Sequence, residues 1–151
     1  MKPQINKLMT GLAGEYMAAA RMNLRGWVAN LTLKNYPGVD IFGFNPQINK
    51  HAGIQVKSCW DTSFFVGVKH SERNLMDQKI KGPYVFVHME SVDEASFYIL
   101  SKSEFINIVN TTDDAYFFKS RTKHIKPDYP IALSLKDLKP FKDKWDSLWK
   151  D

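Results

Sequence analysis

The sequence has only one cysteine, Cys59, and so lacks the paired thiols that a disulfide or a typical zinc site requires. A single thiol cannot form an intramolecular disulfide, so the fold does not depend on one. The four histidines lie far apart in the sequence, and no Cys-x-x-Cys pair accompanies them. A zinc site is therefore not expected. We interpret Cys59 as a small apolar side chain of a strand rather than as a nucleophile.

Long apolar runs are also missing. No stretch approaches the ~20 apolar residues that a membrane-spanning helix needs, and the positively charged start at residues 1–7 has no apolar segment behind it. We therefore expect no membrane partner, no signal peptide and a cytoplasmic protein. The sequence further lacks a glycine-rich phosphate loop and a nucleophile elbow. A small-molecule enzyme on an unrelated α/β fold is left without support.

The residues that are present fit one soluble domain. The 151 residues are 44% hydrophobic and 25% charged, and a chain of this length can bury a sizeable core. No internal repeat, low-complexity tract or linker divides the chain, so we expect residues 1–151 to form a single domain. The net charge of +5 and the pI of about 9.2 favour an anionic partner.

Hydrophobic periodicity predicts a helix over residues 10–25, followed by Gly26 where a left-handed C-cap is usual. Its apolar positions at helical spacing are Ala13, Met17, Ala20 and Leu24. Strands are predicted at residues 27–33, 39–45, 53–60, 84–89 and 96–100, with 63–68 as a further strand or an extension. Helices are predicted at 72–81 and 103–110, and the segment 113–130 shows no regular pattern. A C-terminal helix is also predicted, and we expect one apolar stripe of this helix to pack against the rest of the domain. The stripe consists of Leu138, Phe141, Trp145, Leu148 and Trp149.

Three polar residues of the predicted sheet require an explanation. Gln55 and Lys57 share one face of a strand, although glutamine and lysine are poor residues to bury. Asp40 opens the neighbouring strand, and antiparallel pairing brings it near Lys57, in a register that the loop leaves open. Spacing alone permits two interpretations. One is a site for a hard cation such as Mg²⁺, which takes oxygen ligands, and the other is a structural ion pair of Asp40 with Lys57.

The pattern of Asp40 followed by Gln55-Val56-Lys57 resembles the motif of the PD-(D/E)xK nuclease superfamily, which includes restriction enzymes and Holliday-junction resolvases. The groups Gly-Glu-Tyr, Arg-Gly-Trp, Pro-Gly-Val-Asp and Ile-Gln-Val-Lys further resemble small uncharacterised bacterial proteins of this fold. The resemblance covers roughly the first 90 residues. It implies an α/β (α+β), restriction-endonuclease-like core: helix, three strands, helix and strand around a central mixed sheet, with C-terminal additions.

The resemblance also implies an activity, namely metal-dependent hydrolysis of phosphodiester bonds in DNA with Mg²⁺ or Mn²⁺ as the cofactor. The implied catalytic residues are Asp40, Gln55, Lys57 and Glu15, and the implied metal ligands are Asp40, Gln55, the Val56 carbonyl and Glu15. In this scheme Lys57 orients the attacking water or stabilises the pentacovalent phosphorane. A homodimer is implied as well, because cutting two strands is easiest with two sites.

Two alternatives stay open from these residues. Gln55 stands where the superfamily usually has an acid, so the same fold could serve as a catalytically inactive nucleic-acid-binding or protein-interaction module. Glu15 lies roughly opposite the predicted apolar face, so either its helix is buried nearly all round or Glu15 is solvated. Candidate nucleic-acid contacts are the basic residues Lys69, Arg73, Lys119, Arg121 and Lys123, although such runs are more often solvated loops.

Overall fold

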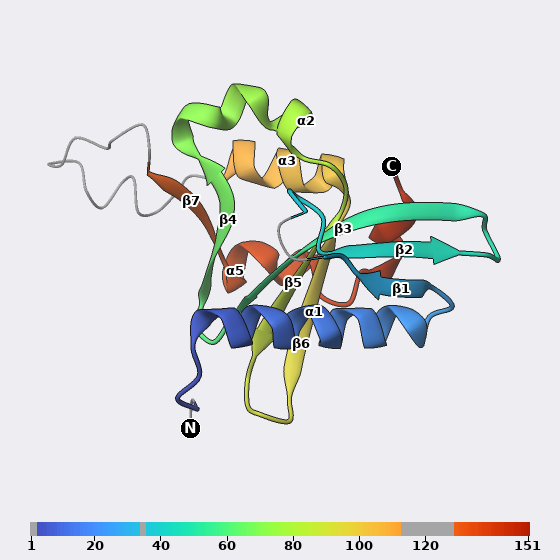
Figure 1. The fold of residues 1–151 in the computed structure, drawn as a ribbon. Coiled ribbons are helices and arrows are strands. Elements are labelled where there is room, and N and C mark those ends of the chain that lie inside the picture. The colour runs from blue at the N-terminus through green and yellow to red at the C-terminus, as the bar shows by residue number, and fades with distance from the viewer. Residues whose placement is uncertain (1–2, 34–35, 113–128) are drawn as a thin grey trace, which may run out of the picture.

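The structure, a computed structural model, describes residues 3–33, 36–112 and 129–151. Its centre is a five-stranded mixed sheet with the strand order β1-β2-β3-β5-β6 (Figure 1). Neighbouring strands are antiparallel except for β3 and β5, which run parallel. The strands of this sheet are β1 (Val28–Leu31), β2 (Ile41–Asn45), β3 (Lys50–Cys59), β5 (Tyr84–Met89) and β6 (Ala95–Leu100).

Helix α1 (Lys7–Asn23) covers one face of this sheet, and the Asn6 side chain caps its first turn by accepting from the Met9 N–H at 2.8 Å. Its buried line is formed by Gly14, Ala18 and Met22, which recur every fourth residue. Small side chains let the helix backbone approach closely, since a Cβ at Gly14 would lie 1.7 Å from the Ser58 Oγ of β3.

The predicted apolar face of this helix is wrong in its second half. Ala20 is exposed, and Leu24 is the C-cap residue with 77% of its surface exposed. Ala13 and Met17 do pack against the core as partly buried side chains. The buried line runs one residue later than predicted, through Gly14 instead of Ala13, because the missing side chain of Gly14 lets the helix backbone approach β3 there.

A second apolar core lies on the opposite face of the sheet. It is covered by α3 (Lys102–Thr111) and by a two-stranded antiparallel sheet of β4 (Ser63–Lys69) and β7 (Pro130–Ser134). A capping box at Ser101 and Glu104 begins α3. The helix predicted at 72–81 is a 3₁₀ turn, η1 (His70–Leu75), followed by the short helix α2 (Met76–Lys79). Both sheet faces are therefore buried at β5, as its nearly continuous apolar sequence predicted.

The C-terminal segment is not the single helix that its apolar stripe predicted. It forms α5 (Leu135–Leu138), η2 (Lys139–Phe141) and η3 (Trp145–Trp149). Asp143 adopts a positive φ of 55° between the last two, which ends any regular helix there. The expectation that the segment packs on the protein is confirmed. Leu138 belongs to the second core, and Trp145 and Leu148 belong to the first core, which lies between α1 and the sheet.

The predicted α+β class is confirmed. The order helix, three strands, helix and strand corresponds to α1, β1 to β3, the η1–α2 segment and β5, with β4 inserted after β3 and with β6 and the later elements as additions. The antiparallel pairing of β2 with β3 is also confirmed, and its register places Ile41 opposite Ile54. Across the described ranges, no helix is long and apolar enough to span a membrane.

Candidate functional site

A gap in the central sheet lies where β2 begins. The last backbone hydrogen bond of the β2–β3 ladder runs from the Asp40 N–H to the Ile54 carbonyl at 2.8 Å, while β3 continues to Cys59 alongside β5. The Asp40 carboxylate occupies this gap, where its Oδ2 accepts from the Val56 N–H at 2.7 Å and from the Gln55 side-chain amide. Residues 40, 55 and 56 are therefore brought together by direct contact.

The loop before β2 fixes the Asp40 backbone. Thr32 donates from its N–H to the Asp40 carbonyl at 2.9 Å and from its hydroxyl to the Val39 carbonyl at 2.6 Å. Gly38 adopts a φ of 76°, which a residue with a side chain rarely does. The loop therefore holds the Asp40 carboxylate against β3.

Lys57 lies on the same face of β3 as Gln55 and is half-buried. Burial lowers the pKa of its ammonium group; the Asp40 carboxylate acts in the opposite direction, and the charge of Lys7 adds to the lowering. The ammonium reaches β4 at Gly67, where a Cβ would lie 3.3 Å from the Lys57 Nζ. Within the described residues Asp40 and Lys57 form no direct ion pair, and they interact through space.

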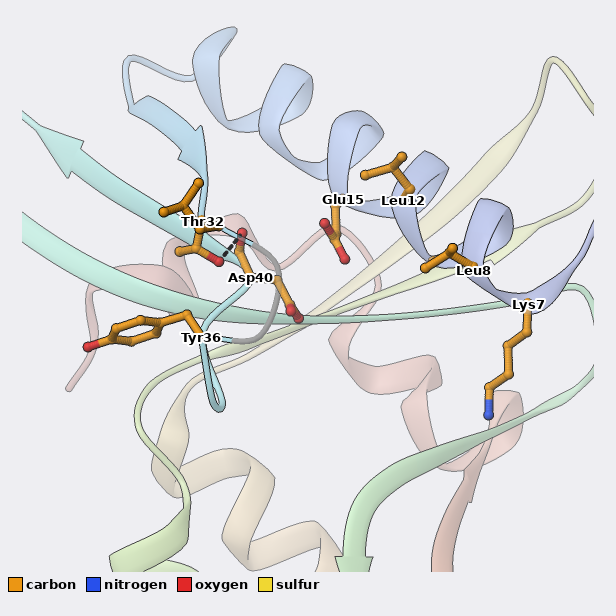
Figure 2. A pocket seen from close by; sticks show the side chains of 9 residues that line it. Lys7, Leu8, Leu12, Glu15, Thr32, Tyr36 and Asp40 are labelled. Carbon is orange, nitrogen blue, oxygen red and sulfur yellow. Dashed lines mark hydrogen bonds between the residues drawn. The ribbon is translucent and has the colours of Figure 1, made fainter.

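Glu15 approaches the same place from α1. A cavity of about 310 Å³ separates the first half of α1 from the loop that leads to β2. Glu15 and Asp40 both line this cavity, and Figure 2 shows the Glu15 side chain pointing from α1 toward Asp40. Glu15 is half-buried, although α1 itself is not buried all round. The close packing of the neighbouring Gly14 on Ser58 brings this part of the helix to the sheet.

Several residues near Asp40 were not predicted from the sequence. Lys7 and Tyr36 line the cavity, and the charge of Lys7 acts on Lys57. Tyr84 pairs with Gln55 in the parallel β3–β5 register and stacks on Phe105 at a centroid distance of 3.9 Å. Burial raises the pKa of the Tyr84 hydroxyl, and the Asp40 charge raises it further. The sequence indicates only that Tyr84 belongs to a mostly apolar strand, and the pairing of β3 with β5 is what places it by the site.

The oxygen atoms around the gap suit a hard divalent cation. Asp40 and Glu15 supply carboxylates, and Gln55 offers its amide oxygen to an ion once its side-chain amide turns over, because the amide nitrogen faces Asp40 in this structure. The Val56 carbonyl faces the same side as the Val56 N–H, toward the gap, because both backbone groups of a strand residue point to one neighbour. In the part of the chain that the structure describes, no group of three or more His, Cys, Asp or Glu residues gathers. The donor set therefore fits Mg²⁺, which retains several waters, better than zinc.

The basic residues predicted to contact nucleic acid are only partly placed. Lys69 ends β4 and Arg73 lies in η1, in the segment that follows Gly67. Lys69 is exposed, and its N–H donates to Glu72 at 2.9 Å, whereas Arg73 is half-buried. The other members of the prediction, Lys119, Arg121 and Lys123, lie outside the described residues.

No protein-family model matches the chain, and no curated protein matches it. Among solved structures, it is similar to Hjc, a Holliday junction resolvase from Archaeoglobus fulgidus, with 11% sequence identity. The match covers 87% of this chain and 93% of that chain, with a TM-score of 0.48. A likeness this distant carries no conclusion about this chain, whose site is described by its own geometry.

Proposed function

We propose that this protein is a metal-dependent nuclease that hydrolyses phosphodiester bonds in DNA, with Mg²⁺ or Mn²⁺ as its cofactor. The observation that carries the proposal is the Asp40 carboxylate in the gap of the sheet, in contact with Gln55 and Val56 and near Lys57. This arrangement supports the resemblance of the sequence to the motif of the PD-(D/E)xK superfamily. The protein acts as a homodimer in this proposal, because two sites allow both strands to be cut.

The proposed roles follow from the position of each group. The Asp40 and Glu15 carboxylates, the Gln55 amide oxygen and the Val56 carbonyl would hold the ion. When bound, a divalent ion supplies positive charge beside the scissile phosphate and acidifies a water molecule. Lys57 contributes a second, fixed positive charge. Because its ammonium is half-buried, its attraction to the charge that develops on the phosphate is less screened than at the surface.

Replacement of the lysine tests the catalytic role. Lys57→Ala is expected to lower the rate of DNA cleavage by about 100-fold or more, because the lost charge acts in the transition state. DNA affinity measured in EDTA should change little. The assay follows nicking of plasmid, branched and single-stranded DNA with Mg²⁺ or Mn²⁺, beside the variant Lys136→Ala, which removes an exposed lysine of α5.

The second candidate is a catalytically inactive module that binds nucleic acid or protein. The observation that favours it is the hydrogen bond from the Gln55 amide to Asp40, because it satisfies that carboxylate oxygen without a metal. Circular dichroism establishes that each purified protein is folded. If the folded wild type cleaves none of the three DNA forms with either metal, the inactive module replaces the nuclease.

A further inference from the structure

An exposed aromatic face lies on the side of β1, β2 and β3 that faces away from α1. The strand registers place Val28, Phe44 and His51 in one row across the sheet, with Phe42 in the next row. Phe42 is 55% exposed, Val28 and His51 are exposed, and Phe44 is half-buried. The rings of Phe44 and His51 already stack, with centroids 4.5 Å apart and planes at 24°. We call these four residues the β2–β3 aromatic face.

The β2–β3 aromatic face is on the same side of the sheet as the proposed site. Side chains alternate along a strand, and the Asp40 N–H continues the β2–β3 ladder. The side chains that share this side are therefore Asp40, Phe42 and Phe44 along one line, and His51, Gln55 and Lys57 along the other. A rise of about 3.4 Å per residue places Phe42 about 7 Å and Phe44 about 14 Å from Asp40. In Figure 1 the far end of the β2–β3 hairpin extends away from α3.

The charge of this region suits an anion. From Tyr16 to Trp60 the sequence contains one carboxylate, that of Asp40. Of the basic residues of the same stretch, Lys57 shares the side of β3 that carries His51, whereas Arg21 and Arg25 lie over Phe97 and Trp145 on the opposite side of the sheet. Lys50 directly precedes His51 on β3 and is exposed.

We propose that the β2–β3 aromatic face binds the unpaired bases of single-stranded DNA, so that DNA with unpaired nucleotides beside the scissile bond is the substrate class. Exposed aromatic rings stack on bases of any sequence, and nearby lysines attract the phosphates. Bases inside a duplex already stack on their neighbours and do not offer a free face to Phe42. The assignment of the face to the substrate rests on the proposed function, whereas its binding of single strands does not require cleavage.

The experiment measures binding without cleavage. Fluorescence anisotropy in EDTA follows a labelled single-stranded oligothymidylate and a labelled duplex of the same length. Phe42→Ala and His51→Ala should each weaken binding of the single strand by about tenfold, since one stacking partner is lost. Phe42→Trp should restore it. The matched control is Phe65→Ala, which removes a phenylalanine of β4 that is 59% exposed and should change nothing.

The salt dependence adds a second readout. Phe42→Ala should leave the slope of log affinity against log salt unchanged, because no phosphate contact is lost. Lys50→Ala should reduce the magnitude of that slope by about one, which is the contribution of one lost phosphate contact.

The possible failures are distinguishable. Equal single-strand affinity of Phe42→Ala and wild type overturns the proposal, as does an equal loss of affinity for single strand and duplex. A change from dimer to monomer in sedimentation, with single-strand affinity unchanged, assigns the face to self-association and also overturns it. If single strands bind through Phe42 but DNA is never cleaved with Mg²⁺ or Mn²⁺, the binding face is supported and the nuclease proposal alone fails.

Discussion

One oxygen of the Asp40 carboxylate receives two hydrogen bonds from β3, one from the Val56 backbone and one from the Gln55 side chain. The backbone donor is independent of the residue at position 56, whereas the amide donor exists only because position 55 is a glutamine. A glutamate there has nearly the same shape but turns a hydrogen bond into repulsion between two carboxylates. The identity of residue 55 therefore sets how strongly the site depends on a cation.

We predict that Gln55→Glu lowers the stability of the metal-free protein by about 1–3 kcal/mol at neutral pH, because a charged acceptor loses its donor and gains a like charge. This loss should shrink as the pH falls, since like-charge repulsion raises the pKa of one carboxyl group and its protonation removes the repulsion. Mg²⁺ should raise the melting temperature of Gln55→Glu more than that of wild type, because an added carboxylate increases the attraction to the ion.

For Asp40→Asn, Mg²⁺ should no longer raise the melting temperature, because the substitution removes the carboxylate that contacts β3. Calorimetric titration of Mg²⁺ and Mn²⁺ into the three proteins, with melting curves in EDTA, checks both variants. Gln78→Glu is the control, since it adds one charge at an exposed position of α2. Equal and negligible metal binding by wild type, Asp40→Asn and Gln55→Glu would remove the metal site from the proposal.

At the scale of elements, the strands were easier to predict than the contacts of the first helix. β5 matches its predicted range because the segment from Tyr84 to Met89 is apolar except for His88 and is preceded by Gly82 and Pro83. β3 begins at Lys50, three residues before the predicted start, because pairing with β2 holds polar residues in the ladder. The sequence placed Gln55 and Lys57 on one face by alternation alone, but the register that brings Asp40 to them depends on the turn.

The α1–β3 contact at Gly14 yields a prediction at this scale. Gly14→Ala should destabilise the protein by about 1–3 kcal/mol, because the new methyl group overlaps Ser58 and moves the helix off the sheet. The displaced Glu15 should also weaken Mg²⁺ binding. Gly11→Ala is the matched control: a methyl group there would meet nothing within 4 Å beyond its own stretch of helix, and alanine should stabilise the helix by about 0.5–1 kcal/mol.

Urea unfolding and Mg²⁺ titration of the two alanine variants test the contact. Stability of Gly14→Ala equal to that of Gly11→Ala would show that α1 does not approach β3 at this point. A loss of stability with unchanged Mg²⁺ affinity would instead separate Glu15 from the metal site while leaving the packing intact.

At the scale of the whole molecule, the C-terminal segment connects the two cores around one edge of the central sheet. Phe141 packs against the second core and Trp145 belongs to the first. Between them the chain passes β6, where the Asp143 N–H donates to the Phe97 carbonyl at 2.9 Å and Lys142 forms a bridge with Tyr98. The segment therefore covers part of an edge strand that would otherwise expose unpaired backbone groups.

This path explains why the C-terminal prediction succeeded in part. Four of the five apolar residues of the stripe are buried or half-buried, as predicted, because their hydrophobicity is a local property; the exception is Trp149, which is 38% exposed. The single helix was wrong because one stripe on one helix can face only one core. A chain that serves both faces of a sheet has to turn at its edge, and the turn at Asp143 follows from tertiary contacts rather than from local sequence.

The docking of this segment depends on Trp145. Its ring contacts Phe97 at a centroid distance of 5.6 Å, and the Arg25 guanidinium lies 4.4 Å from the ring centroid. Trp145→Ala should therefore cost about 3–5 kcal/mol in the free energy of unfolding, because it leaves a cavity in the first core and removes a cation–π contact. Trp145→Phe should cost less than about 1.5 kcal/mol. The buried indole N–H has no hydrogen-bond partner among the described residues, so removing this polar group offsets part of the free energy lost with the smaller buried apolar area. Urea unfolding of both variants provides the measurement. A cost below about 1 kcal/mol for Trp145→Ala would mean that η3 does not close the first core.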